Sequence, residues 1–346
     1  AGNEIVNQSF NEVYPAEEIL DKSQNTLYQI SQVRNNSGFT MISELVRPAL
    51  NKLEKLHTDK RDVPGQRTGF DAFDSLTAGF QKSDLVIIAA RPSMGKTSFA
   101  LNIAEYVAIE EQKPVIIFSL EMSKESLTMR FLSSVARVDA QNLRKGKFTI
   151  AEWQKVTSAV ADKISKAPIY IDDSSDINAI EMRARARRLA VQLEAQKTPL
   201  AMIVIDYIQI MRGNSGRSES RQQEVAEISR SLKGLARDLK VPVVALSQLS
   251  RKTEDRSRKE SGNTQPVLSD LRESGAIEQD ADLVAFIHYN KDELKNSVDH
   301  SIGASIIIGK QRNGPTGEIK LLFESRYTKF SNMDYSFKNE EEQDAV

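Results

Sequence analysis

The sequence predicts an α/β protein with a largely parallel sheet and helices on both of its faces. From Thr68 onward, short apolar runs alternate with segments of helical periodicity, which are the usual crossovers between parallel strands. One of these runs, Leu85–Ala90, is followed by a turn at Arg91 and Pro92 and by a helical pattern from Lys96 onward. An unbroken apolar run of this kind suits a strand that is buried on both faces, as parallel strands are.

The composition is that of an ordinary globular protein. Of the 346 residues, 40% are hydrophobic and 27% are charged, so we expect one large domain with an appendage. No apolar run approaches the roughly 18 residues that a membrane span needs, which excludes membrane insertion. The absence of cysteine excludes disulfides, thiolate metal sites and cysteine nucleophiles, and it fits a cytoplasmic setting. With a net charge of −1, nucleic-acid binding would need a local basic surface.

The first 62 residues predict helices that precede the main domain. Residues 16–32 carry apolar side chains at helical spacing, and 35–38 then break the chain. Residues 39–57 predict a second helix, whose apolar face is formed by Ile42, Leu45, Val46, Ala49, Leu50, Leu53 and Leu56. That face packs either on its own domain or on a neighbouring subunit, and the polar segment 58–65 permits both.

The main domain is expected over 63–337, and its strands are short apolar runs bounded by turn residues. Six are expected in a parallel sheet: 85–90, 115–120, 169–172, 202–206, 243–247 and 283–288. Two more, 304–309 and 318–323, flank the turn signal Asn313-Gly314-Pro315 and predict an antiparallel hairpin at the edge of the sheet. The tail over 338–346, rich in Glu, Gln and Asp, is expected to be disordered.

The turn after the first strand carries a phosphate-binding motif. Gly95, Lys96 and Thr97 match the second half of the P-loop pattern Gly-x-x-x-x-Gly-Lys-Ser/Thr, while Ala90 stands at its first glycine. In such a loop, backbone N–H groups and the N-terminus of the following helix surround phosphates. Lys96 would neutralise the β- and γ-phosphates of ATP, and the Thr97 hydroxyl would ligate Mg²⁺. The alternative is a solvated turn in which Thr97 caps a helix. The predicted nucleotide-binding residues of this segment are Ala90, Arg91, Pro92, Ser93, Met94, Gly95, Lys96, Thr97 and Ser98.

Three polar residues lie at the ends of other predicted strands. Asp206 ends an apolar run, where a Mg²⁺ ion that bridges phosphates needs an oxygen ligand, although a lone aspartate there is often a cap. Glu121 could polarise the water that attacks the γ-phosphorus, or it could cap the next helix. Gln248 could hydrogen-bond a γ-phosphate or the attacking water.

Basic residues gather in two polar loops and at the predicted hairpin tip. The loop 250–260 contains Arg251, and the loop 212–221 contains Arg217 and Arg221; both predict contacts with the phosphates of single-stranded DNA, or else solvated surfaces. Lys310 and Arg312 are candidate cations for a phosphate site, or an exposed turn. Because a sheet edge lies at the perimeter of a domain, we expect them to reach a neighbour's nucleotide, which implies a ring or filament.

Eight segments between residues 68 and 317 resemble the ATPase domain of the DnaB-type replicative helicases of bacteria and their phages. They are T-G-F-D-A-F-D-S-L-T-A-G-F (68–80), A-R-P-S-M-G-K-T (90–97), F-S-L-E-M-S (118–123), V-I-D-Y-I-Q-I-M (204–211), R-Q-Q-E-V-A-E-I-S-R-S-L-K (221–233), A-L-S-Q-L-S-R (245–251), D-L-R-E-S-G-A-I-E-Q-D-A-D (270–282) and K-Q-R-N-G-P-T-G (310–317). The resemblance implies a RecA-like fold, a homohexameric ring around single-stranded DNA, and ATP-driven movement from 5′ to 3′ as the fork is unwound. An alanine at the first glycine position of the P-loop, as at Ala90, resembles that family's own version of the motif.

The resemblance also implies roles for single residues. In the nucleotide site, Lys96 and Thr97 would hold phosphate and Mg²⁺, Glu121 would activate water, Asp206 would support the metal, Gln248 would sense the γ-phosphate and Arg130 would be a further arginine. Arg312, with Lys310, would be an arginine finger, a cation that completes the nucleotide site of the adjacent subunit. Arg272, Glu273 and Gly275 would contact DNA, so the expected DNA contact moves partly away from the loop that contains Arg251.

The resemblance extends to domains and partners. Residues 39–62 would hold the linker helix that docks on the next subunit, and 1–38 would be a helical remnant without the family's N-terminal collar. The expected function is an ATP-dependent replicative DNA helicase motor that acts on single-stranded and forked DNA, with primase and a helicase loader as partners of the full-length protein. Two other classes stay open: a RecA-like recombinase filament, and a replisome scaffold whose nucleotide only sets its shape. The segment 271–282 points away from a recombinase.

Overall fold

The computed structural model describes residues 40–58, 63–211, 221–250, 265–271, 275–290, 297 and 300–333. The chain forms two compact units, residues 1–61 and 62–346. The predicted helix over 16–32 and the tail over 338–346 lie outside the described residues. No helix in the described ranges is long and apolar enough to cross a membrane.

The described part of the first unit is one helix, α3 (Ile42–Thr58). It confirms the predicted helix over 39–57 to within a few residues. The apolar side chains described along it are exposed, among them Ile42 at 75% and Leu53 at 62%. Which surface covers this face therefore stays a prediction.

The second unit is built on a nine-stranded sheet with the order β3-β2-β4-β5-β1-β6-β7-β8-β9. Its first six strands in this order are mutually parallel, and β7, β8 and β9 continue it antiparallel. The strands are β1 (Leu85–Ala90), β2 (Val115–Ser119), β3 (Ile169–Asp172), β4 (Met202–Asp206), β5 (Val243–Gln248), β6 (Leu283–His288), β7 (Ser301–Gln311), β8 (Gly317–Glu324) and β9 (Lys329–Asn332). This arrangement confirms the predicted mostly parallel sheet.

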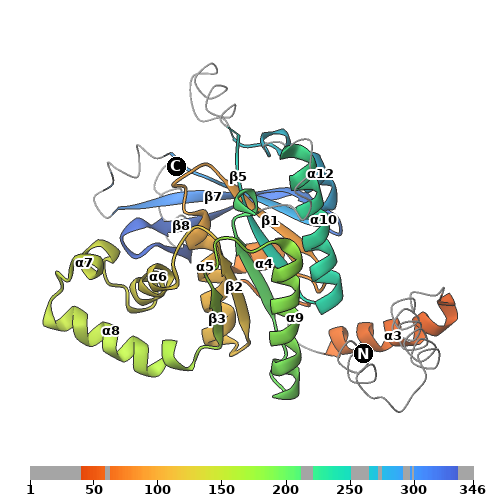
Figure 1. The fold of residues 1–346 in the computed structure, drawn as a ribbon, viewed down its shortest axis with the longest axis horizontal. Coiled ribbons are helices and arrows are strands. Elements are labelled where there is room, and N and C mark those ends of the chain that lie inside the picture. Colours follow the sequence, from red (N-terminus) through yellow and green to blue (C-terminus); the bar gives the residue numbers. More distant parts are fainter. Residues whose placement is uncertain are drawn as a thin grey trace, which may run out of the picture. The chain divides into compact units, whose positions relative to one another are not determined.

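The helices of this unit lie on both faces of the sheet (Figure 1). They are α4 (Asp71–Thr77), α5 (Lys96–Glu105), α6 (Lys124–Ala136), α7 (Ala140–Lys145), α8 (Ile150–Asp162), α9 (Ala179–Ala195), α10 (Arg221–Leu239) and α12 (Gly275–Asp280). A π-helical turn, Tyr106–Glu110, continues α5, and short 3-10 turns occur at Ile164–Lys166, Ile208–Ile210, Leu268–Asp270 and Ser325–Tyr327.

Strand β1 explains why the sheet is covered on both faces, because all six of its residues are buried. Val86 and Ile88 pack into a core with α4 and α5, whereas Leu85 and Ile87 pack into a second core with α9, α10 and α12. Successive side chains of a strand point to opposite faces, so an unbroken apolar run requires apolar partners on each side.

The predicted hairpin forms but does not lie at the edge of the sheet. Strand β7 pairs with β6 and β8, and β8 pairs with β9, so β9 is the edge strand at this end of the sheet. The expectation of an edge hairpin was wrong because the sequence of β9, K-F-S-N, has a single apolar residue. That residue, Phe330, is buried, and its backbone N–H donates to Asn102 Oδ1 of α5 at 2.8 Å.

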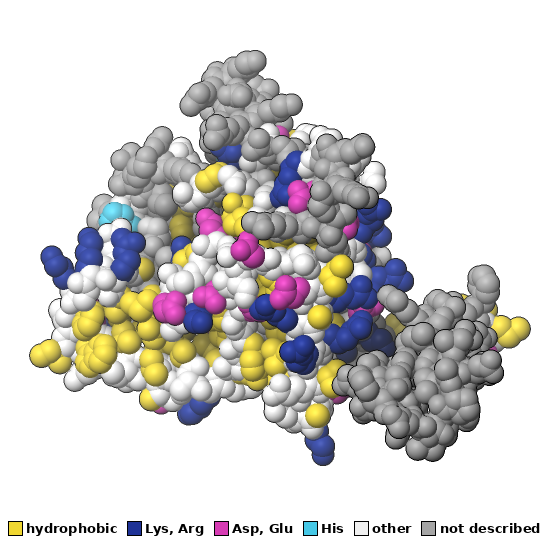
Figure 2. Space-filling model, viewed as in Figure 1, with side chains coloured by type: hydrophobic (Ala, Val, Ile, Leu, Met, Phe, Trp, Pro, Cys, Tyr) yellow, Lys and Arg dark blue, Asp and Glu magenta, His cyan; other side chains and the backbone are white. Residues whose placement is uncertain are grey.

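Helices α6, α7 and α8 enclose a small core of their own, which contains Val138, Leu143 and Val156. The outer side of α8 is apolar: Ile150 is 80% exposed, and Trp153 stacks on Phe148 with ring centroids 5.4 Å apart. Figure 2 shows this area as hydrophobic side chains over α8. An exposed apolar area of this kind is typical of an interaction surface.

Candidate nucleotide-binding site

A cavity of about 470 Å³ lies against the turn between β1 and α5. Eleven of the predicted site residues line it, and the set consists of Ala90, Arg91, Pro92, Ser93, Gly95, Lys96, Thr97, Ser98, Glu121, Arg130 and Gln248. The structure therefore brings together residues from the ends of β1, β2 and β5. The side chain of Met94, predicted here as well, is instead buried in the core.

The backbone of the turn explains where glycine is needed. Gly95 has a φ of +74°, and a Cβ at this position would lie 3.1 Å from the Phe330 ring and 3.3 Å from the Phe323 ring. The positive φ therefore favours glycine, and a Cβ at this position would fit only if the two rings shifted slightly. Ala90, by contrast, is the last residue of β1 in extended backbone, which alanine adopts without strain. The departure from the P-loop pattern at Ala90 is therefore tolerated.

Lys96, Thr97 and Asp206 meet at the start of α5. The Thr97 hydroxyl donates to Asp206 Oδ2 at 2.7 Å, and Lys96 Nζ lies 4.0 Å from Asp206 Oδ1. Asp206 is 3% exposed, and Oδ1 has no hydrogen-bond partner. Burial lowers the pKa of Lys96, while the charges of Asp206 and Glu121 oppose this shift. Lys96 Nζ also lies 4.2 Å from the centroid of the Tyr207 ring.

These oxygens fit a Mg²⁺ ion that is held mainly by a nucleotide. The buried Asp206 Oδ1 is a carboxylate oxygen without a hydrogen-bond partner, and the Thr97 hydroxyl lies beside the same carboxylate. Within the described ranges, no group of three or more His, Cys, Asp or Glu residues could hold a metal by itself. Mg²⁺ commonly uses one or two protein oxygens together with substrate phosphates and water. Thr97 and Asp206 are therefore suitable ligands, directly or through water.

Glu121 lies in the loop between β2 and α6. It does not cap α6, because Ser123 is the N-cap and accepts a hydrogen bond from the Ser126 N–H at 3.3 Å. The capping alternative for Glu121 was therefore wrong, and its exposed carboxylate lines the cavity. Across the site, Arg130 Nη1 donates to Ser98 Oγ at 3.4 Å. Burial lowers the pKa of Arg130, against the charges of Asp206 and Glu121.

Hydrogen bonds connect the end of β5 to its neighbours. The Gln248 backbone N–H donates to Gln209 Oε1 at 3.2 Å, and Gln209 Nε2 donates to Ser247 Oγ at 2.8 Å. Arg91 Nη1 donates to the Leu249 carbonyl at 3.0 Å. The turn between β1 and α5 is thereby tied to the end of β5, the strand that leads into the basic loop 251–264, which lies outside the described residues.

Lys310 and Arg312 do not line this cavity. They lie at the opposite end of the sheet, because β7 runs antiparallel to β6 and Lys310 pairs with Val284 near the start of β6. Lys310 donates to the Glu278 carbonyl, and Arg312 Nη2 donates to the Gln279 carbonyl at 2.5 Å. Their action on a neighbouring subunit stays a prediction.

The candidate DNA contacts are only partly described. Arg217, Arg251, Arg272 and Glu273 lie outside the described residues. Arg221 begins α10, donates to the Gln209 carbonyl at 2.7 Å and pairs with Glu224. Gly275 begins α12. Contact of these residues with DNA stays a prediction.

Five residues that line the cavity were not predicted: Met122, Tyr207, Tyr289, Phe323 and Ser325. The Tyr289 hydroxyl donates to the Ser93 carbonyl at 3.3 Å, and burial raises the pKa of Tyr289 to about 12. Tyr289 directly follows β6, so the signal that identified Asp206 and Gln248, a polar residue after a buried strand, was available for it. Phe323 sits in β8 and carries no such signal.

The comparisons with known proteins agree with this geometry. Residues 65–332 match the model of the DnaB-like helicase C terminal domain. The chain belongs to the DnaB-like helicase family. It is 48% identical over 324 residues to the replicative DNA helicase DnaB of Geobacillus stearothermophilus; the alignment covers 92% of this chain and 68% of the relative. It is 46% identical over 321 residues to the replicative DNA helicase DnaC of Bacillus subtilis, and that alignment covers 93% of this chain and 68% of the relative.

Solved structures have the same fold. One of them, an ATPase domain, matches with a TM-score of 0.75 and 34% identity over 86% of this chain and all of that chain. A DnaB-like replicative helicase, described together with its interactions with primase, matches with a TM-score of 0.72 and 31% identity. This match covers 96% of this chain and 75% of that chain. The predicted RecA-like ATPase core is confirmed. The chain is an ATP-hydrolysing motor of the replicative helicase class.

Proposed function

We propose that this helicase hydrolyses Mg²⁺-bound ATP in the cavity beside Gly95 and uses the energy to move from 5′ to 3′ on single-stranded DNA, separating the strands of a fork. The observation that carries the proposal is the convergence of Lys96 and Thr97 on Asp206, a carboxylate 109 residues away from Thr97 in sequence. Three further polar side chains, those of Glu121, Arg130 and Gln248, line the same cavity.

Each residue has a defined task in this proposal. Lys96 and the backbone N–H groups of the loop bind the β- and γ-phosphates. Thr97 and Asp206 would hold Mg²⁺, which draws negative charge from the phosphates when it is bound. Glu121 accepts a proton from the attacking water as the water oxygen bonds to the γ-phosphorus and the bond from that phosphorus to the ADP oxygen breaks. Gln248 responds to the loss of the γ-phosphate.

The assembly that we propose is a homohexamer in which Arg312, with Lys310, completes the nucleotide site of the next subunit. The support is that both cations lie away from their own cavity, at the other end of the sheet. In this proposal, residues 39–62 comprise the linker helix, which would dock on the neighbouring subunit, and a linker; 1–38 would be a helical remnant and 338–346 a disordered acidic tail. Primase, with which a solved DnaB-like helicase interacts, and a helicase loader are the proposed protein partners.

Single-stranded DNA would contact the motor domain, residues 63–337, through its basic loops. The proposed contacts are Arg217, Arg221, Arg251, Arg272, Glu273 and Gly275. A loop that follows a strand of the nucleotide site is well placed to respond to hydrolysis, and the loop with Arg251 follows Gln248 directly.

The decisive experiment measures ATP turnover, oligomer mass and fork unwinding on the same preparation. We expect turnover that single-stranded DNA stimulates, a hexameric mass, and unwinding only of forks with a free 5′ tail. The Lys96→Ala variant should lose turnover, whereas Lys147→Ala, which removes an exposed lysine that does not line the cavity, should retain it. Strand pairing without unwinding would favour a recombinase filament. Turnover by an isolated protomer that ignores DNA would refute the proposal.

A further inference from the structure

Lys310 and Arg312 are anchored by the end of α12 and by Asp282, which lies between α12 and β6. Lys310 Nζ donates to the Glu278 carbonyl and, at 3.3 Å, to the Gln279 carbonyl, which also accepts from Arg312 Nη2. Arg312 Nε lies 3.6 Å from Asp282 Oδ1, and the Arg312 backbone N–H donates to the Asp282 carbonyl at 2.8 Å. The carbonyls at a helix C-terminus attract cations, so both side chains have defined partners within their own protomer.

The carboxylate of Asp282 is itself held by two other elements. Its Oδ2 accepts a hydrogen bond at 2.8 Å from the backbone N–H of Leu85, the first residue of β1, and forms an ion pair with Lys233 of α10. The Asp282 backbone N–H donates to the Leu85 carbonyl at 2.9 Å. Lys233 is fixed in turn by the Ser83 carbonyl at 2.8 Å. Leu85 and Lys233 therefore fix the orientation of the Asp282 carboxylate independently of Arg312.

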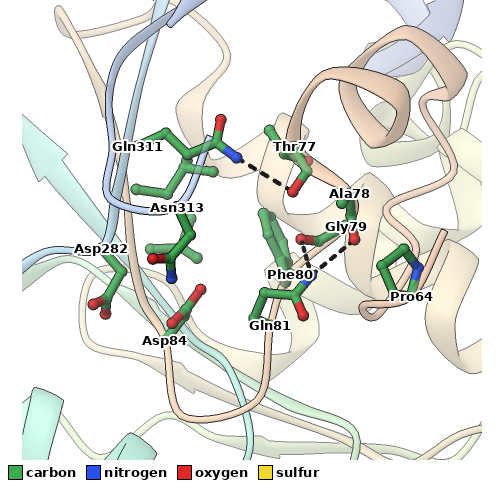
Figure 3. A pocket seen from close by; sticks show the side chains of 12 residues that line it. Pro64, Thr77, Ala78, Gly79, Phe80, Gln81, Asp84, Asp282, Gln311 and Asn313 are labelled. Carbon is green, nitrogen blue, oxygen red and sulfur yellow. Dashed lines mark hydrogen bonds between the residues drawn. The ribbon is translucent and has the colours of Figure 1, made fainter. Parts of the chain in front are cut away.

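A second carboxylate shares this region without anchoring the finger. Asp84 and Asp282 line one cavity of about 290 Å³ together with Asn313 of the hairpin turn, and Figure 3 shows the three side chains on the same side of it. The pKa of Asp84 is raised to about 6 by burial and then by the charge of Asp282. Arg312 acts on Asp84 through its charge alone, whereas it contacts Asp282. Asp84 therefore offers a matched control.

We infer that Asp282 is a positioning residue for the Arg312 finger. The inference rests on the proposed function, in which Arg312 acts on the nucleotide of the next subunit. The Arg312 side chain is 47% exposed, and a long side chain with that freedom loses conformational entropy when a phosphate fixes it. Asp282 restricts the side chain beforehand and points it in one direction. A finger displaced by about 1 Å would cost on the order of a hundredfold in rate.

The test uses Asp282→Asn, which removes the charge but retains an oxygen for the Leu85 N–H. We expect kcat for ATP to fall about a hundredfold with KM unchanged, because the nucleotide cavity beside Gly95, here called the cradle, stays intact in each protomer. Asp84→Asn should leave kcat near the wild-type value. If Asp282→Asn does not fold, Lys233→Met, which loosens the same carboxylate from the side of α10, should lower kcat in the same way. An unchanged kcat, or a raised KM with a lowered melting temperature, would overturn the assignment.

Mixed rings then show which subunit the substitution affects. Asp282→Asn protomers mixed with Lys96→Ala protomers should regain activity, because a Lys96→Ala subunit supplies an intact finger to an intact cradle; in a random mixture, about a quarter of the interfaces combine the two. Asp282→Asn mixed with Arg312→Ala should regain none, since every finger is then defective. Equal recovery in both mixtures would show that Asp282 does not act through the finger.

One control separates this inference from the function on which it rests. Arg312→Ala mixed with Lys96→Ala tests the finger alone. If this mixture stays inactive, action between subunits is refuted and the role of Asp282 falls with it. If it recovers activity and the Asp282→Asn mixture with Lys96→Ala does not, only the assignment of Asp282 is refuted.

Discussion

The Thr97 hydroxyl donates a 2.7 Å hydrogen bond to the carboxylate of Asp206, which lies 109 residues further along the chain. The bond joins the first turn of α5 to the carboxyl end of β4, although β5 lies between β4 and β1 in the sheet. It therefore places the two predicted Mg²⁺ ligands side by side before any nucleotide arrives.

The first prediction concerns this pair. Thr97→Val keeps the shape of the side chain but removes the oxygen, so we expect ATP turnover to fall by roughly a hundredfold and the Mg²⁺ concentration for half-maximal rate to rise. Thr97→Ser retains the hydroxyl and should keep most of the activity. The measurement is a Mg²⁺ titration of steady-state turnover. Equal activity of the valine and serine variants would remove Thr97 from the metal site.

The second prediction separates binding from chemistry. Glu121→Gln retains the size of the side chain but cannot accept the proton of the attacking water, so turnover should fall by about 10² to 10⁴-fold. Affinity for a fluorescent ATP analogue should stay close to that of the wild type, because Lys96 and the loop are unchanged. Glu125→Gln, in the first turn of α6, is the matched control. A variant that turns over normally would show that another group takes the proton.

The third prediction tests the space above Gly95. In Gly95→Ala, a positive φ costs roughly 1–2 kcal/mol, and contact of the new Cβ with the Phe330 and Phe323 rings adds about 1–3 kcal/mol. Gly146→Ala is the control, because Gly146 also has a positive φ, +66°, but a Cβ there meets nothing within 4 Å. Urea unfolding of both variants measures the difference. Equal destabilisation would mean that the aromatic rings move aside.

The fourth prediction concerns pH and stability. Asp74 accepts hydrogen bonds from Thr68, yet burial raises its pKa from 3.8 to about 6. The folded state therefore binds more protons than the unfolded state between these values, so this group's contribution to stability is complete below pH 3.8 and is lost as the pH rises through about 6. Asp74→Asn should abolish that part of the pH dependence. Urea unfolding of both proteins between pH 4.5 and 7.5 checks it, and identical slopes would contradict the raised pKa.

The sequence predicted the parallel strands well and the antiparallel edge less well, for a physical reason. Strands buried on both faces must be unbroken apolar runs, and the buried strands β1, β4 and β6 have the predicted bounds. Strand β3, at the other edge of the sheet, is only partly buried but also has the predicted bounds. Strand β9 needs apolar contact only at Phe330, and its place depends on pairing with β8 and on Asn102, which a local pattern does not contain.

In the candidate site, too, some residues could be predicted from the sequence and others could not. Polar residues at the carboxyl ends of buried strands, such as Asp206 and Gln248, could be predicted because parallel strands end at one edge of the sheet. Met94 was assigned to the cavity by its place in the motif, but its side chain turns into the core. The partners of Lys310 and Arg312 could not be predicted, because two of them are backbone carbonyls, which every residue possesses.

The packing of Phe330 against Gly95, together with its hydrogen bond to Asn102 across 228 residues, has a consequence for biosynthesis. The residues that we propose to bind phosphate are translated early, but Phe330, which packs against them, leaves the ribosome only near the end of the motor domain. A nascent chain therefore contains the complete Gly95–Thr97 motif long before Phe330 can pack against it. Nucleotide binding during synthesis should accordingly begin late, once β9 has joined the sheet.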